Sequence, residues 1–222
     1  MNNTSEKNKI CAVIPFFNEK RTLKEIITRT LPFVDFVIAV NDGSTDNPHD
    51  EIPKNEKVIL LSYPQNRGKG YALKKGFEES IKRVSDITIT LDADLQHMPE
   101  KIPELISGLK NYDVVVGNRL NNLKKMPFQR VISNKLTSFL LSIKTKQKLL
   151  DTQSGYRAYK TRILNDILPS YAGFEAESEM LVNAAEKNYK INFVPIPTIY
   201  AGENSKMRSL QAIAGFIKVL LK

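Results

Sequence analysis

Residues 86–96, which read DITITLDADLQ, join a short apolar run to two aspartates. Asp86–Leu91 is rich in Ile and Thr, a composition typical of a buried strand. Asp92, Asp94 and Gln96 follow within five residues. Two carboxylates and an amide carbonyl at a strand end form an oxygen-rich site of the kind that Mg²⁺ or Mn²⁺ prefers. A strand-ending turn with solvated aspartates is the alternative interpretation, because the pattern is short.

Similar apolar runs occur along most of the chain, and segments with helical periodicity separate them. Strands are predicted at Lys9–Phe17, Phe33–Val40, Val58–Ser62, Asp86–Leu91, Val114–Gly117 and Ile191–Val194. Helices are predicted at Thr22–Thr30, Gly70–Val84, Pro99–Leu109, Pro127–Ile143, Glu177–Lys187 and Ser209–Leu221. This alternation indicates an α/β fold, with a mainly parallel sheet and helices on both faces. No linker composition divides the chain, so a single domain is expected.

Polar clusters follow the predicted strands at the point where each strand ends. They are Asn18-Glu19, Asn41–Asp46, Asp92–Gln96 and Asn118-Arg119. The loops at the carboxyl ends of parallel strands line the ligand crevice, so we expect these clusters to meet in one site. Asn66–Gly70 (NRGKG) is a turn ahead of a helix, where backbone N–H groups can bind an anion.

Length and composition limit the class of protein. The chain has 222 residues, of which 41% are hydrophobic and 26% are charged, as in an ordinary globular domain. The single cysteine, Cys11, cannot form an internal disulfide, which fits a reducing compartment. No stretch approaches the ~18 uninterrupted apolar residues of a membrane span, and the polar residues 1–8 do not resemble a secretory signal. A cytoplasmic location is therefore expected.

The net charge of +9 is concentrated in two segments. Residues 119–148 carry eight basic side chains and residues 204–222 carry four, and neither segment has an acidic one. This distribution favours an anionic partner, with a solvated basic surface as an equal alternative. Aromatic residues are scarce there, so we expect no nucleic-acid partner. Pro127–Ile143 and Ser209–Leu221 are amphipathic, and they either lie on an anionic membrane at its cytoplasmic face or pack on the core.

Five motifs, taken in order, resemble those of the family 2 glycosyltransferases. They are Ile14–Glu19 (IPFFNE), Val40–Asp46 (VNDGSTD), Asn66–Gly70 (NRGKG), Leu91–Gln96 with His97 and Glu100, and Asp151–Arg157 (DTQSGYR). Within that family the chain is similar to the dolichyl-phosphate mannose synthases and polyprenyl-phosphate sugar transferases. The resemblance implies a GT-A fold, a GDP- or UDP-linked sugar donor and a divalent metal, Mg²⁺ or Mn²⁺. It covers residues 9–206, which leaves a polar tail at 1–8 and a C-terminal amphipathic helix at 207–222.

The resemblance also implies roles for residues at matching positions. Donor-binding residues would be Pro15, Phe17, Glu19, Val40, Asp42, Lys69, Asp92, Ala93, Asp94, Gln96 and Lys206. The metal ligands would be Asp92, Asp94 and Gln96, and the acceptor phosphate would meet Arg119, Arg130 and Ser133. Asp94, Arg119 and Asp151 would be catalytic.

Two positions depart from the family pattern. The usual paired aspartates of the second motif are Asn41-Asp42 here, which bears on the preference for one nucleotide over another. Near the C-terminus, Tyr200–Lys206 lacks the arginine that often precedes the Ser-Lys pair, which bears on the identity of the acceptor.

The nature of the acceptor decides whether the reaction needs a general base. A lipid phosphate has a second pKa of about 6 and is already largely dianionic at neutral pH, so cationic residues suffice to hold it. A sugar or protein hydroxyl would need a carboxylate base, for which Asp151, Glu175, Glu177 and Glu179 are the candidates. The basic segment 119–148 favours a polyprenyl phosphate. The alternatives are a soluble glycan-extending transferase and a non-catalytic nucleotide-sugar or lipid-binding relative, and the sequence indicates no particular protein partner.

Overall fold

The computed structural model describes residues 8–120, 128–197, 199 and 209–222. Its strands form one sheet in the order β3-β2-β1-β4-β6-β5-β7. Neighbouring strands are parallel, except that β6 runs antiparallel to both β4 and β5. The strands are β1 (Ile10–Phe16), β2 (Phe36–Asp42), β3 (Val58–Tyr63), β4 (Ile87–Thr90), β5 (Val114–Asn118), β6 (Arg157–Lys160) and β7 (Ile191–Pro195).

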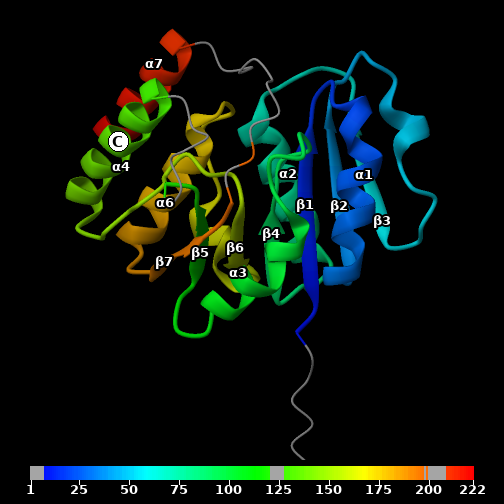
Figure 1. Cartoon of the computed structure of the whole chain (residues 1–222), viewed down its shortest axis with the longest axis horizontal. Helices are drawn as coiled ribbons and strands as arrows, with labels where there is room; N and C mark the ends of the chain where they lie inside the picture. The colour runs from blue at the N-terminus through cyan, green and yellow to red at the C-terminus, as the bar shows by residue number, and fades with distance from the viewer. Residues whose placement is uncertain (1–7, 121–127, 198, 200–208) are drawn as a thin grey trace, which may run out of the picture.

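Helices cover both faces of this sheet. They are α1 (Lys20–Thr30), α2 (Lys69–Lys82), α3 (Ile102–Gly108), α4 (Phe128–Thr145), α5 (Leu164–Ile167), α6 (Glu175–Glu186) and α7 (Ser209–Leu221). Side chains of α1 and α3 belong to one hydrophobic core, and those of α2, α4, α5, α6 and α7 belong to the other. In Figure 1, α4 and α7 lie together at the end of the molecule that carries β5 and β7, away from α1 and β3.

Alternation along the central strands explains the two cores. In β1, Cys11 and Val13 face the core on the α2 side, while Ala12 and Ile14 face the core on the α1 side. All four side chains are fully buried, as expected for a strand that is covered on both faces. The predicted α/β fold with a mainly parallel sheet and helices on both faces is therefore confirmed.

The sequence prediction missed β6 and the short helix α5. β6 has only four residues, Arg-Ala-Tyr-Lys, and its two charged ends hide the strand pattern. Its placement comes from the interior of the fold, where the Arg157 guanidinium donates to the carbonyl oxygens of Thr152, Ser154 and Glu177. These bonds satisfy a fully buried cation and fix the strand between β4 and β5.

The strand ends meet at one edge of the sheet. Phe16 at the end of β1 pairs with Asn41 near the end of β2, and Val13 pairs with Thr90 at the end of β4. Thr90 Oγ1 also donates to the carbonyl oxygen of Gly155, 2.8 Å away, just before β6. The polar clusters after these strands consequently open onto a common side.

The C-terminal helix α7 packs on the domain. Val219 is fully buried, and Lys222 Nζ lies 2.6 Å from Glu179 Oε1 of α6. Ile213, Ile217 and Leu221 of the same helix are exposed. Within the described part of the chain, no helix combines the length and the hydropathy that a membrane span requires.

Candidate active site

A tight turn after β4 presents Asp92 and Asp94. The backbone N–H of Asp92 donates to His97 Nδ1 at 3.0 Å, and the N–H of Gln96 donates to Asp94 Oδ1 at 3.0 Å. Leu95, between Asp94 and Gln96, adopts a left-handed φ of 60°, which reverses the chain. The turn therefore fixes both carboxylates at the end of a rigid strand.

The two aspartates differ in their electrostatic environment. Burial alone would raise the pKa of Asp92, but the Lys69 ammonium, whose Nζ lies 2.6 Å from Asp92 Oδ1, outweighs it and holds the pKa at about 2. The pKa of Asp94 is raised, first by burial and then by the neighbouring negative charge of Asp92. Among the described residues, no salt bridge joins a cation to Asp94 as Lys69 is joined to Asp92, so a positive charge brought to this place would favour both carboxylates.

The side chain of His97 stabilises this turn. Its ring is buried and stacks on Tyr156, with 5.0 Å between the ring centroids. Burial lowers the pKa of His97, so the ring is neutral at pH 7. Because Nδ1 accepts the hydrogen bond from Asp92, Nε2 carries the proton, and it lies 3.9 Å from Asp92 Oδ2. His97 therefore orients Asp92.

The donor set of the turn fits a divalent ion that shares its coordination with a substrate. Asp92, Asp94 and Gln96 supply carboxylate and carbonyl oxygens, which suit Mg²⁺ or Mn²⁺. Among the described residues, no group of three or more His, Cys, Asp or Glu side chains is arranged to enclose a metal. Mg²⁺ commonly uses one or two carboxylates and completes its shell with water and phosphate oxygens.

Arg119, directly after β5, lies within electrostatic reach of this turn, since its charge lowers the pKa of Asp92. Its Nε and Nη2 donate to the two carboxylate oxygens of Asp151, each at 2.9 Å, and its backbone N–H donates at 3.0 Å. Asn134 Nδ2 of α4 donates to the same carboxylate at 2.8 Å. Burial opposes the charge of Asp151, but Arg119 outweighs it, and the pKa of Asp151 is lowered. Asp151 thereby fixes the direction of the Arg119 side chain.

Asp42 organises the loop that precedes α2. Its Oδ1 accepts from the N–H of Arg67 at 2.9 Å and its Oδ2 from the N–H of Gly68 at 2.8 Å. Gly68 has a φ of 100°, which a residue with a Cβ rarely adopts. The N–H of Gly70 donates to the carbonyl oxygen of Ala172 at 2.7 Å. The loop is therefore held on both sides, and Lys69 is placed at the start of α2.

Asp42→Ala is expected to lower the free energy of unfolding by about 1–3 kcal/mol, because two partly buried N–H groups lose their acceptor. Urea unfolding followed by circular dichroism measures the change. Asp50→Asn, an exposed carboxylate, is the matched control. A loss smaller than about 0.5 kcal/mol, the usual range of a surface substitution, would contradict this role of Asp42.

The other predicted site residues lie as follows. Pro15 and Ala93 are buried, and the Val40 side chain belongs to the core on the α2 side. Phe17, Glu19 and Gln96 are half-buried at the ends of β1 and β4. On α4, Arg130 is half-buried and Ser133 is exposed. Lys206 lies outside the described residues.

Sequence reasoning missed several contacts. Glu177 was expected only as a possible base, yet its Oε1 lies 3.0 Å from Lys69 Nζ. Asn134 and His97 were given no role in orienting Asp151 and Asp92. The Lys69–Glu177 and Asn134–Asp151 contacts join separate segments that no local pattern relates. The His97–Asp92 bond lies within one turn, five residues apart.

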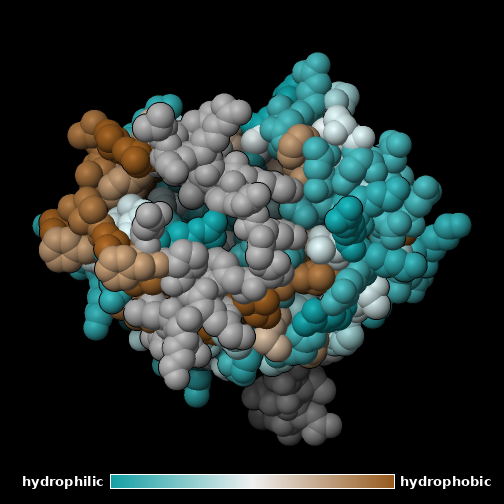
Figure 2. Space-filling view, turned by 45° about the horizontal axis from the view of Figure 1, so that its top comes forward, coloured by the Kyte–Doolittle hydropathy of each residue, from teal (hydrophilic) through white to brown (hydrophobic). Residues whose placement is uncertain are grey.

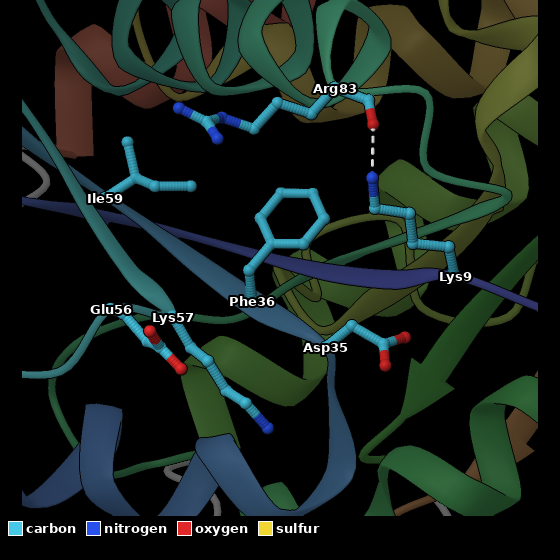
Figure 3. A pocket seen from close by; sticks show the side chains of 7 residues that line it. All are labelled: Lys9, Asp35, Phe36, Glu56, Lys57, Ile59 and Arg83. Atoms are coloured by element: carbon cyan, nitrogen blue, oxygen red, sulfur yellow. Dashed lines mark hydrogen bonds between the residues drawn. The ribbon is translucent and has the colours of Figure 1, made fainter.

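A cavity of about 520 Å³ lies at the opposite end of the strands. Figure 3 shows Lys9, Asp35 and Lys57, which precede β1, β2 and β3, around it. Lys9 Nζ donates to the carbonyl oxygen of Arg83. Both acidic and basic side chains line this cavity, and no residue of the Asp92 turn is among them.

The fold and the site define a glycosyltransferase of the GT-A type. The glucosyl-3-phosphoglycerate synthase of Mycobacterium tuberculosis, whose structure contains Mn²⁺ and UDP, superposes with a TM-score of 0.74. That match has 21% identity and covers 96% of this chain and 79% of the other. The chain belongs to Glycosyl transferase family 2, which matches residues 11–168.

Several similar proteins have named activities, and two of them act on dolichyl phosphate or dolichol phosphate by name. The UDP-N-acetylglucosamine–dolichyl-phosphate N-acetylglucosaminyltransferase of Methanococcus voltae is 32% identical over 232 residues, covering 93% of this chain and 92% of the relative. The dolichol-phosphate mannosyltransferase of Pyrococcus furiosus is 27% identical over 200 residues, covering 84% of this chain and 55% of the relative. The predicted membership of family 2, in the polyprenyl-phosphate sugar transferase branch, is confirmed.

Proposed function

We propose that the chain transfers a sugar from a nucleotide-diphosphate sugar to a polyprenyl phosphate at the surface of an anionic membrane. One observation carries this proposal: Asp151 joins the site to α4. Its carboxylate holds Arg119 beside the Asp92 turn and also accepts from Asn134 on the buried side of α4. The opposite side of α4 is apolar and exposed. An amphiphile with a phosphate head and an apolar tail matches both surfaces.

The donor would bind at the carboxyl ends of β1, β2 and β4. Pro15, Phe17, Glu19, Val40 and Asp42 would border the nucleoside, the last by shaping the loop at Arg67–Gly68. Asp92, Asp94 and Gln96 would hold Mg²⁺ or Mn²⁺, and Ala93 would border the donor within the same turn. Lys206, outside the described residues, is proposed to contact phosphates. A bound ion would neutralise charge on the diphosphate and make it a better leaving group.

The acceptor phosphate would meet Arg119, with Arg130 and Ser133 on α4 nearer its lipid. A phosphate oxygen would attack the anomeric carbon, and the bond from that carbon to the diphosphate oxygen would break, with inversion. The phosphate monoester is largely dianionic at pH 7, so no proton has to be removed. Arg119 would hold this nucleophile in position, because its guanidinium is fixed by Asp151.

Three of the four candidate bases, all except the half-buried Glu175, favour a phosphate acceptor over a hydroxyl acceptor. Asp151 is 0% exposed and paired with Arg119, and Glu177 is paired with Lys69. Glu179 accepts from the backbone of Ser170 and from Lys222. These three carboxylates are therefore engaged in other contacts, which weighs against a soluble transferase that extends a glycan.

The exposed apolar side of α4 and α7 supports a location at the membrane surface. On α4 it consists of Phe128, Ile132, Leu136, Phe139 and Ile143, and on α7 it consists of Ile213, Ile217 and Leu221. Figure 2 shows hydrophobic side chains gathered at this end of the molecule. Lys135, Lys144 and Lys218 lie on the same two helices, as expected where lysines meet anionic headgroups.

Replacing Leu136 and Phe139 together with Glu is expected to reduce partition onto anionic vesicles at least about tenfold, since each buried apolar side chain contributes ~1.5–3 kcal/mol. Flotation of the protein with phosphatidylglycerol vesicles measures this partition. Val84→Glu is the control, because Val84 is 76% exposed and precedes β4 at the other end of the sheet. Equal flotation of both variants would remove the membrane surface from the proposal.

Transfer itself is tested with radiolabelled UDP- and GDP-sugars, a polyprenyl phosphate in detergent and either Mg²⁺ or Mn²⁺. Label that moves into the organic phase with one donor supports the function and identifies the nucleotide. Label that reaches a free sugar or protein hydroxyl instead would favour the hydroxyl-acceptor alternative. Donor binding without transfer to any acceptor would favour a non-catalytic relative.

A further inference from the structure

Lys69 is the first residue of α2, a position that electrostatics disfavours for a cation. The amino end of a helix carries positive partial charge, and the first turn of α2 has no acidic residue to offset it. The side chain is nevertheless drawn inward and is only 15% exposed. Its Nζ lies 2.6 Å from Asp92 Oδ1 and 3.0 Å from Glu177 Oε1. Two carboxylates, rather than the helix, account for its placement.

The three charged groups are tightly enclosed. A Cβ added to Gly155 would lie 2.7 Å from Glu177 Oε1, 2.9 Å from Asp92 Oδ2 and 3.0 Å from Lys69 Nζ. The Phe174 ring centroid lies 5.9 Å from the same nitrogen. Because the side chains of Lys69 and Glu177 are only 15% and 8% exposed, water screens the electrostatic interactions of these two groups less than it would at the surface.

Glu177 is well placed to hold the ammonium without Asp92. It lies in the first turn of α6, where the helix dipole favours a negative charge. Its own carbonyl oxygen accepts from Arg157, which fixes this turn against β6. Glu177 is outside the Asp92 turn and has no part in the proposed metal coordination.

We propose that Lys69 is an internal counter-ion on the metal-binding carboxylate Asp92, and that Glu177 is a positioning residue that retains Lys69 when a divalent ion and a diphosphate bind. This inference rests on the proposed function. In the donor-free chain the ammonium neutralises Asp92 and competes with the ion for it. A bound ion repels the ammonium toward Glu177, from where it meets the incoming diphosphate, so metal and diphosphate binding favour one another.

The charge-neutral double variant Lys69→Met/Glu177→Gln tests this competition. It removes one positive and one negative charge, so the net charge of the site is unchanged and Asp92 loses its counter-ion. Mn²⁺ binding without nucleotide is measured from the electron paramagnetic resonance signal of the free ion. The double variant is expected to bind Mn²⁺ at least about tenfold more tightly than the wild type. Glu177→Gln alone is expected to weaken binding, because Lys69 then depends on Asp92.

Lys82→Met and Glu186→Gln, exposed residues of the same two helices, are the matched controls and are expected to bind Mn²⁺ like the wild type. UDP and GDP, added in parallel, are expected to tighten Mn²⁺ binding less in the double variant than in the wild type. Thermal unfolding establishes that each variant is folded.

Mn²⁺ affinity of the double variant within twofold of the wild type would overturn the role of Lys69 and Glu177 while leaving the transferase proposal intact. If adding Asp94→Ala to the double variant does not weaken Mn²⁺ binding, the ion lies elsewhere, and the proposed metal site fails together with this inference. Failure of the proposed acceptor is detected separately, by the transfer assay with wild-type protein.

Discussion

Asp94→Ala is expected to lower kcat/KM for sugar transfer by about 10³-fold, the scale of losing one preorganised electrostatic contact in an active site. Asp92 already has Lys69 as a counter-ion, whereas burial and Asp92 raise the pKa of Asp94. Asp94 is thus the carboxylate whose charge an incoming cation would stabilise most. Its removal leaves the turn one carboxylate short of the proposed donor set.

The measurement is transfer of radiolabelled sugar to polyprenyl phosphate at saturating Mn²⁺. The thermal unfolding temperature is expected to change little, because the bond from the Asp92 N–H to His97 still closes the turn. Asp50→Asn, an exposed carboxylate in the loop after β2, serves as the control. Activity of Asp94→Ala within tenfold of the wild type would contradict the assignment of Asp94.

Asp151→Asn is expected to lower the free energy of unfolding at pH 7 by about 3 kcal/mol, because it removes the fully buried carboxylate that pairs with the Arg119 cation. Transfer activity is expected to fall as well, since Arg119 loses the contacts that fix its direction. Urea unfolding and the transfer assay measure the two effects.

The stability difference between the wild type and Asp151→Asn should depend on pH. The pKa of Asp151 is lowered in the folded state, so its charge stabilises the fold above the unfolded pKa of about 3.9. This contribution is lost as the pH falls through the lower, folded-state pKa. The difference is therefore expected to be constant from about pH 8 to pH 5 and to shrink below about pH 4. A difference that persists unchanged to pH 3 would mean that packing, not charge, is responsible.

Much of the architecture followed from local patterns. The strands β1 to β5 and β7 are apolar runs that end in turn-forming residues, and the structure places each within a few residues of its predicted bounds. β6 escaped prediction because its four residues carry a charge at both ends. Its position between β4 and β5 depends on hydrogen bonds from a buried arginine to residues 152–177.

Local sequence patterns also predicted part of the site. Asp92 and Asp94 follow a strand directly, so their place at the sheet edge is a local property. The partner of Lys69 could not be predicted, because Glu177 reaches it only after α6 packs on α2. Likewise Asp151 and Arg119 meet through the pairing of distant segments, and nothing in either segment alone names the other.

The sequence by itself determined the α/β alternation, the oxygen-rich turn after the fourth strand and the two basic amphipathic segments, because hydrophobic periodicity and strand-end polarity are read over a few neighbouring residues. The tertiary structure alone decided that α7 packs on the domain, with Val219 buried in the core and Lys222, just after the helix, paired with Glu179 of α6, while Ile213, Ile217 and Leu221 remain exposed. It also decided which carboxylates have cations, since ion pairs between distant segments depend on how the helices pack on the sheet. The exposed apolar side chains of α7 support the proposed lipid phosphate acceptor, and the ion pairs of Asp92 and Asp151 underlie the proposals for the metal site and for Arg119.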